Sequence, residues 1–242
     1  MNDMRKTFIA AAIIALGMIV SSFLLSKLFI RINHEKEITV KGYAEQTVHS
    51  DVGKFHCSFN TRKRSLQEAF KEIQNERSIV LQYLQNKGFE ENEIEILNIN
   101  TREIFARDDE GNVTNDIEFY RASQAIQVTS NNVQLINDVS QQITELIREG
   151  IDIYGGSPEF YVTDLAKIKV ALIARATENG FQRAQILAEN SGGRVGSLSS
   201  ARQGVFQITS PNSTQTSDYG IYDTSTIKKT VKAVITLQYN IE

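Results

Sequence analysis

The N-terminal part of the chain is uniformly apolar, whereas the rest alternates between strand-like and helix-like patterns. Residues 7–26 read TFIAAAIIALGMIVSSFLLS and carry no charge, and residues 28–30 extend this apolar run beyond Lys27. At a rise of about 1.5 Å per residue, a helix of this length crosses a hydrocarbon core of about 30 Å. The pattern predicts a transmembrane anchor within residues 1–32, with residues 7–30 in the membrane.

A cleaved signal peptide is the alternative interpretation of this segment, because Arg5 and Lys6 supply a basic start. The apolar run is longer than is usual for a signal peptide, and Leu-Phe-Ile-Arg-Ile follows it in place of a small-residue cleavage site. Lysines and arginines flank both ends of the run, so their count does not select an orientation. The short tail before the run favours a single-pass inner-membrane protein whose domain lies on the periplasmic, extracytoplasmic side.

Beyond a short polar linker at residues 33–37, strand and helix patterns predict one domain over residues 38–242. In its second strand, Phe55, Cys57 and Phe59 alternate with polar side chains, as a half-buried strand requires. Similar runs predict strands at residues 38–43, 52–62, 93–105, 119–129, 152–162, 195–207 and 231–241. The strand at 152–162 is expected to be broken by Gly155-Gly156 and Pro158.

Three helices are predicted from capping signals and apolar periodicity. Ser65 and Glu68 have the spacing of a capping box, and the helix that they open ends at Gly88. The side chains expected on its inward face are Leu66, Phe70, Ile73, Val80, Leu81 and Leu84. The other two helices are predicted from Asn131 or Asn132 to about Gly150, and from Asp164 to Ser191.

Short connections between neighbouring strands favour an α+β fold over a doubly wound parallel sheet. We therefore expect a mixed, mainly antiparallel sheet with three helices packed on it, preceded by one transmembrane helix. Residues 108–112 are expected to form a hairpin loop, and the Ser/Thr/Asn-rich residues 208–226 a loop before the last strand. The face of the sheet without helices must meet water, a partner or a second sheet.

Two stretches resemble the SIMPL-domain family. Residues 38–59, ITVKGYAEQTVHSDVGKFHCSF, are similar to the strand pair that opens that family's domain, and its pattern is filled by Val40, Gly42, Val48 and Asp51. Residues 165–201 are similar to its second signature, an alanine-rich helix followed by a glycine turn and a strand. The matching positions there are Ala171, Ala174, Ala184, Leu187, Ala188, Gly193 and Gly196.

The resemblance covers residues 38–242, and Ser50 stands where the family usually has a proline. It implies a cell-envelope protein, often oligomeric, that is linked to oxidative-stress defence. The family has no established catalytic residues, so the resemblance implies none here.

Composition and single residues narrow the chemistry further. A net charge of -3 provides no basic field for nucleic acid, and a single cysteine excludes an intrachain disulfide. His34, His49 and His56 have no cysteine or carboxylate at metal-ligand spacing, so neither a metal nor a cofactor is expected. Cys57 is expected to be a buried, inert thiol, with redox sensing as the alternative.

Two charged runs are expected to be solvated. Residues 108–112 and Asp116 are acidic enough to suggest calcium but lack the ligand spacing of an EF-hand. Residues 62–64, Arg-Lys-Arg, are interpreted as a turn, with contact to anionic lipid headgroups as the alternative. The chain has no G-x-S-x-G elbow or other catalytic constellation, so we expect no enzyme and assign no catalytic residue.

These patterns lead to a functional hypothesis with one main alternative, and an enzyme of unseen class is the third hypothesis. The hypothesis is a membrane-anchored, non-enzymatic envelope scaffold that self-associates through exposed sheet edges or residues 208–226 to form a homo-oligomer. The alternative is a binding module for a small molecule, lipid or peptide at the membrane surface.

Overall fold

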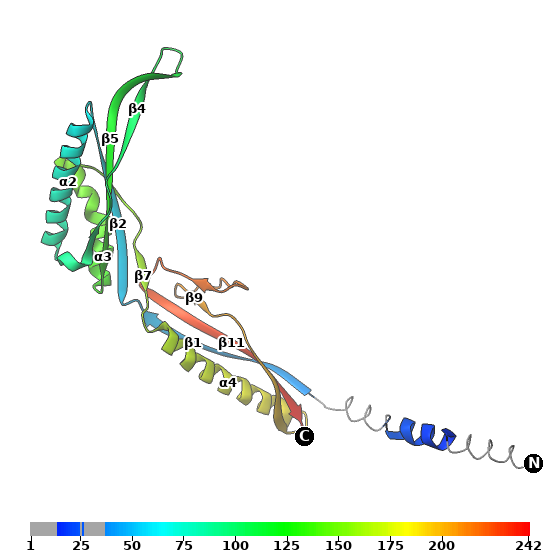
Figure 1. The fold of residues 1–242 in the computed structure, drawn as a ribbon. Helices are drawn as coiled ribbons and strands as arrows, with labels where there is room; N and C mark the ends of the chain where they lie inside the picture. The colour runs from blue at the N-terminus through cyan, green and yellow to red at the C-terminus, as the bar shows by residue number, and fades with distance from the viewer. Residues whose placement is uncertain (1–13, 25, 27–36) are drawn as a thin grey trace, which may run out of the picture. The chain divides into compact units, whose positions relative to one another are not determined.

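The computed structural model describes residues 14–24, 26 and 37–242 (Figure 1). Residues 14–24 are helical. The elements that follow, in chain order, are β1 (Glu37–His49), β2 (Val52–Lys63), α2 (Leu66–Lys87), the 3-10 helix η1 (Glu91–Glu93), β3 (Ile94–Ile96), β4 (Asn100–Arg107), β5 (Val113–Ser130), α3 (Val133–Gln142), the 3-10 helix η2 (Ile143–Glu149), β6 (Asp152–Gly155), β7 (Glu159–Tyr161), α4 (Leu165–Asn190), β8 (Val195–Gln203), β9 (Gln207–Thr209), β10 (Ile221–Tyr222) and β11 (Lys228–Ile241).

The predicted membrane segment, residues 7–30, lies only partly within the described residues. Of this segment the structure describes residues 14–24 and 26, which are helical, and the remainder falls outside. No helix within the described part of the chain is both long enough and apolar enough to span a membrane.

The described strands form two sheets, so the prediction of a single sheet is wrong. One sheet has the order β1-β11-β9-β10, and β8 also pairs with β11. The other sheet has the order β3-β5-β2-β6, in which β4 also pairs with β5 and β7 with β2. Alternation shows that a strand has one buried face, but it does not encode which strand is its partner. Both sheets combine with helices, which confirms the α+β class and its mainly antiparallel pairing.

The chain divides into two compact units. The larger unit contains residues 45–172 and 205–232, and the smaller one contains the described residues up to 44 together with residues 173–204 and 233–242. In the larger unit, α2 and α3 cover one face of the β2–β5 sheet (Figure 1).

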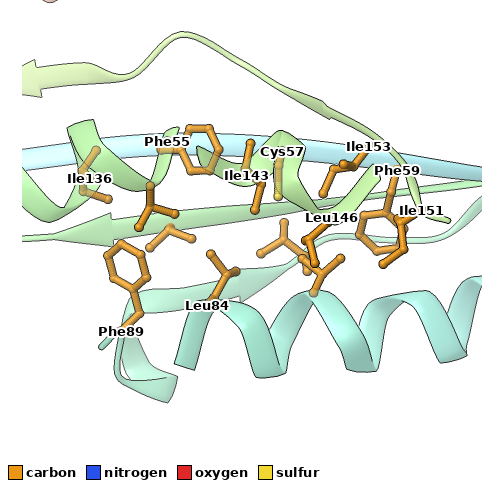
Figure 2. Close-up of a cluster of buried hydrophobic side chains, with 14 of the residues drawn as sticks. Phe55, Cys57, Phe59, Leu84, Phe89, Ile136, Ile143, Leu146, Ile151 and Ile153 are labelled. Atoms are coloured by element: carbon orange, nitrogen blue, oxygen red, sulfur yellow. The ribbon is translucent and has the colours of Figure 1, made fainter. Parts of the chain in front are cut away.

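The predicted alternation along β2 is confirmed in the core of the larger unit. Phe55, Cys57 and Phe59 are at most 1% exposed and pack with Leu84 of α2 and Ile143 of η2 (Figure 2). The polar residues between them on β2 therefore lie on the face opposite the helices.

The ends of α2 agree with the capping signals, but its inward face is shifted. The Ser65 hydroxyl accepts a hydrogen bond from the Glu68 amide at 3.2 Å, and Gly88 ends the helix with φ of 109°. Phe70, predicted to face inward, is 45% exposed, as is Leu66. Ala69 is buried in place of Phe70, because adjacent helical residues differ by about 100° around the axis.

In the smaller unit, α4 lies along one face of the sheet strands (Figure 1). Its contact side is made of alanines, which allow a helix to approach a sheet closely. The Phe181 ring of α4 packs against the Tyr239 ring of β11, with 5.7 Å between ring centroids. The buried residues of α4 in this unit are Ala176, Gly180, Ala184 and Ala188.

Several predicted segments differ from the structure in detail, among them the strand predicted at 195–207, which ends as β8 at Gln203. The predicted strand at 93–105 is divided into β3 and β4, which both pair with β5. The predicted loop at 208–226 contains β10 and most of β9, which pair with each other in parallel. β9 is also held by residues 230–232 of β11. Backbone pairing with distant strands forms these short elements, and no hydrophobic pattern indicates them.

Candidate functional site

Gly42, one of the family-pattern positions, allows α4 to contact β1 directly. A Cβ atom at Gly42 would lie 2.0 Å from the Ala176 carbonyl oxygen and 2.8 Å from the Gly180 nitrogen. A Cβ atom at Gly180 would in turn lie 3.2 Å from the Gly42 Cα. Two glycines therefore face each other across the helix–strand contact, and the role of this signature residue is packing.

Asp51, a second pattern position, holds the segment that leads into α4. Its carboxylate accepts hydrogen bonds from the Thr163 backbone amide at 2.9 Å and from the Thr163 hydroxyl at 2.5 Å. The hydroxyl bond is the main reason why the pKa of Asp51 is lowered from its ordinary value. Both oxygens are used within the chain, so this carboxylate has a structural task.

The histidines are not brought together by the described fold. His49 and His56 are exposed on β1 and β2, and His34 lies outside the described residues. Within the part of the chain that the structure describes, no group of three or more His, Cys, Asp or Glu side chains is placed to hold a metal ion.

Cys57 is fully buried in the core of the larger unit, as predicted. Its side chain is 0% exposed, and this burial raises the pKa of the thiol to about 12. The thiolate is the reactive form of cysteine. The raised pKa and the burial of Cys57 therefore both lower the reactivity of its thiol.

We expect Cys57 to be unreactive toward a thiol reagent in the folded protein. Titration with a chromogenic disulfide at neutral pH should detect no thiol until denaturant is added, and then one per chain. Rapid modification of the native protein at Cys57 would contradict this and would favour the redox-sensing alternative.

The β4–β5 hairpin extends past the end of β2 (Figure 1). β2 pairs with β5 only from Tyr120 to Ser130, so residues 113–119 of β5 pair with β4 alone. The other side of β4, which we call the β4 edge, has no partner strand among the described strands. We call residues 104–119 the projecting hairpin.

The projecting hairpin exposes apolar side chains. Phe105 and Ile117 lie directly opposite each other and are 39% and 41% exposed, and Val113 is 61% exposed. An unpaired edge strand presents free backbone donors and acceptors, and it pairs readily with another strand unless charges or bulges block it. The hairpin has the unpaired backbone groups and the apolar surface of a pairing site, and the register of β4 against β5 is regular from Asn100 to Ile104 and shifts on either side of Phe105.

The acidic loop at the tip of this hairpin is organised by its own hydrogen bonds. One Asp108 carboxylate oxygen accepts from the backbone amides of Glu110 at 3.0 Å and Asn112 at 2.8 Å. Arg107 donates to the Gly111 carbonyl at 2.7 Å, and Gly111 has φ of 86°. The predicted hairpin loop is confirmed, and Asp108 acts as its internal acceptor.

The tripeptide Asn-Thr-Arg occurs twice, at residues 60–62 of β2 and 100–102 of β4, on either side of β5. Both copies align with the Arg-Ala-Ser of residues 121–123. Side chains directly opposite each other in paired strands point to the same face. The arrangement creates an arginine row, Arg62-Arg121-Arg102, and beside it a polar row, Asn60-Ser123-Asn100.

A cavity of about 420 Å³ lies at these two rows, on the face of the sheet opposite the helices. Its polar lining side chains include Ser58, Asn60, Asn100, Arg102, Arg121 and Ser123. Tyr154 of β6, which is 71% exposed, adds an aromatic wall. This polar cavity is the second candidate site of the larger unit.

Sequence reasoning missed this site. It treated residues 62–64 as one basic turn, whereas Arg62 belongs to the arginine row and the Lys63 Nζ lies 2.8 Å from the Glu72 Oε1. The repeated Asn-Thr-Arg was the available signal. Its meaning depends on β5 lying between the two copies, which the sequence does not state.

Glu76 of α2 is the carboxyl group most altered by its surroundings. Burial raises the pKa of Glu76 to about 7, with a further rise from the nearby Glu72 and an opposing effect from the Thr61 hydroxyl. The Oε2 atom of Glu76 is buried and has no hydrogen-bond partner among the described residues. The ionised form is therefore disfavoured in the folded protein.

We expect Glu76→Gln to stabilise the protein above neutral pH. The pKa of Glu76 is raised on folding, so stability falls as the pH rises from its ordinary pKa of 4.5 to about 7. Because the side chain is half-buried and water screens it, the variant's free energy of unfolding at pH 8 should exceed the parent's by about 1 kcal/mol. Denaturant unfolding at pH 4 and pH 8 measures it; an equal effect at both would contradict the assignment.

The fold and the site together define an α+β domain whose signature residues hold the backbone together and whose exposed features are a hairpin edge and a polar cavity. The family model described as "SIMPL: Protein of unknown function (DUF541)" matches residues 38–239. The chain belongs to this family. A search of curated proteins found no match.

Proposed function

We propose that this chain is a membrane-anchored, non-enzymatic scaffold of the cell envelope that self-associates through the β4 edge. The observation that carries the proposal is the projecting hairpin, which combines an unpaired edge with exposed Phe105, Val113 and Ile117. A two-stranded ribbon is only marginally stable in water by itself. Pairing with a second copy would supply the missing strand.

The proposal that residues 7–30 anchor the chain in a membrane rests on their composition. The run from residue 7 to 26 is uncharged, and its described part is a helix whose large apolar side chains all lie outward. Ile14, Leu16 and Ile19 are 62%, 66% and 66% exposed. Water disfavours such a surface, whereas lipid matches it.

The non-enzymatic part of the proposal rests on the tasks of the signature residues. Gly42 and Asp51 serve packing and loop attachment, and the Cys57 thiol is buried. A link to stress defence is part of the proposal and is supported only by the family resemblance.

Sedimentation of the full chain in detergent tests self-association. We expect a particle that contains several copies of the chain and dissociates on dilution. A single chain per micelle at all concentrations would contradict the proposal.

We expect the domain to be extracytoplasmic. An alkaline phosphatase fused after Glu242 should be active in intact bacteria, because that enzyme folds only where its disulfides form. A fluorescent protein that requires the cytoplasm should be dark at the same position. The reverse pair of results would place the domain in the cytoplasm.

A second candidate function is a binding module, and the polar cavity at the arginine row favours it. Its volume of about 420 Å³ is within the range of about 300–1,000 Å³ for small-molecule sites. The proposed self-association uses the unpaired backbone of the β4 edge, whereas the cavity uses side chains on one face of the sheet, including Asn100 and Arg102 of β4.

A further inference from the structure

We propose that the cavity at the arginine row binds a small anionic molecule that carries a phosphate or carboxylate group. This inference names the ligand class of the second candidate function, and it does not depend on self-association. It rests on the alignment of three arginines at one register, two of which (Arg102 and Arg121) line the cavity, and on their lack of carboxylate partners. The polar groups around the cavity support it further.

The three arginines are crowded. Arg121 lies directly opposite Arg62 on one side and Arg102 on the other. Like charges directly opposite each other in an antiparallel pair are destabilising, and a bound anion would relieve that repulsion.

No carboxylate within the described residues neutralises the arginine row. None of the three guanidinium groups has a carboxylate oxygen within 4.0 Å, since the ion pairs in this part of the chain are Lys63–Glu72 and Lys87–Glu145. The Arg62 guanidinium lies over the Phe119 ring, 5.2 Å from its centroid. Asp152 lies directly opposite Asn60 on the neighbouring strand. The Asn60 Nδ2 donates a hydrogen bond to the Asp152 backbone carbonyl at 3.5 Å.

Unused hydrogen-bonding atoms point to the same conclusion. The Arg121 Nε and the Asn60 Oδ1 are buried and have no hydrogen-bond partner among the described residues. An arginine side chain offers a planar set of donors that matches the oxygens of a carboxylate or phosphate. Arg121 and Asn60 both line the cavity, so their remaining polar atoms are the ones that a bound anion can contact.

The size and polarity of the cavity restrict the ligand to a small molecule. Side chains of the polar row provide amide and hydroxyl groups, and Tyr154 provides one aromatic surface. Since the chain carries a net charge of -3, the positive charge is local to this site. A compact anion fits this local charge better than a long polyanion does.

Calorimetric titration of the full chain in detergent tests the inference, with inorganic pyrophosphate as the phosphate probe and citrate as the carboxylate probe. We expect saturable binding of at least one probe, weakened as salt is added. Arg121→Gln and Arg102→Gln should each raise the Kd at least tenfold. Arg148→Gln, at an exposed arginine on η2, is the matched control and should leave the Kd unchanged.

Thermal unfolding without probe shows whether the variants fold. Removal of one crowded charge by Arg121→Gln should leave the unfolding midpoint unchanged or raise it, while the upward shift caused by the probe disappears. The inference is overturned if neither probe binds saturably to the parent protein, or if the two cavity variants bind as tightly as the Arg148→Gln control. Sedimentation of the same samples reports self-association separately.

Discussion

Gly42→Val is expected to abolish the native contact between α4 and β1 in the smaller unit. The first added carbon would lie 2.0 Å from the Ala176 carbonyl oxygen, and this neighbour is helix backbone that cannot rotate away. Valine also adds two methyl groups at a position already in contact with Gly180. Overpacking of this kind costs about 3 kcal/mol, and more where backbone must move. Denaturant unfolding, followed by circular dichroism, measures the loss.

Two further variants accompany this prediction: Lys41→Val as the control and Gly180→Ala as a milder change at the same contact. Lys41→Val adds the same side chain at the exposed neighbouring position of β1 and should have little effect. Gly180→Ala should cost less than Gly42→Val, because its closest new contact, at 2.6 Å, is with the flexible end of the Leu237 side chain. If Gly42→Val were as stable as Lys41→Val, the assigned packing role of the signature glycine would be wrong.

Phe105→Lys is expected to convert the self-associated protein into single chains without unfolding it. Phe105 is 39% exposed on β4, so a lysine can extend into water there. A lysine on an edge strand opposes pairing, because a second copy would bring an equal charge to the same interface. Sedimentation of the full chain in detergent should show a loss of the multimeric particle, with at least a tenfold weaker association.

Ile147→Lys is the matched control for this change. Ile147 lies on η2 and is 56% exposed, so the substitution removes a similar exposed apolar side chain away from the hairpin. It should leave association unchanged. If the two variants associated equally well, the β4 edge would not be the interface, and the segment 208–226 would become the next candidate.

Elements with local signals were predictable from the sequence. The alternation of Phe55, Cys57 and Phe59 correctly indicated the buried face of β2, and Ser65 and Gly88 correctly bounded α2. These signals depend on neighbours within one or two helical turns or along one strand. The division into two sheets was not predictable in this way, because it depends on which distant strand pairs with β11.

The candidate sites depend on long-range pairing to different degrees. The hairpin loop at Asp108 was predictable, but the projecting hairpin follows from where β2 stops pairing with β5. The arginine row required three separate strands to align at one register. Arg121 is a single basic residue within an alternating strand and carries no local signal. Only the repeated Asn-Thr-Arg was visible, and pairing with β5 is what aligns its two copies.

Cysteine cross-linking at the β4 edge tests the central proposal most directly. The only natural cysteine, Cys57, is buried, so a new thiol introduced by Glu103→Cys at an exposed position of β4 reports on its own surroundings. In membranes that contain the full chain, mild oxidation should link two copies through this position, and the parent chain should remain unlinked. Addition of Phe105→Lys should abolish the link. Ile147→Cys places a thiol on η2, away from the hairpin. If Ile147→Cys became linked under the same conditions while Glu103→Cys stayed unlinked, self-association through the β4 edge would be contradicted.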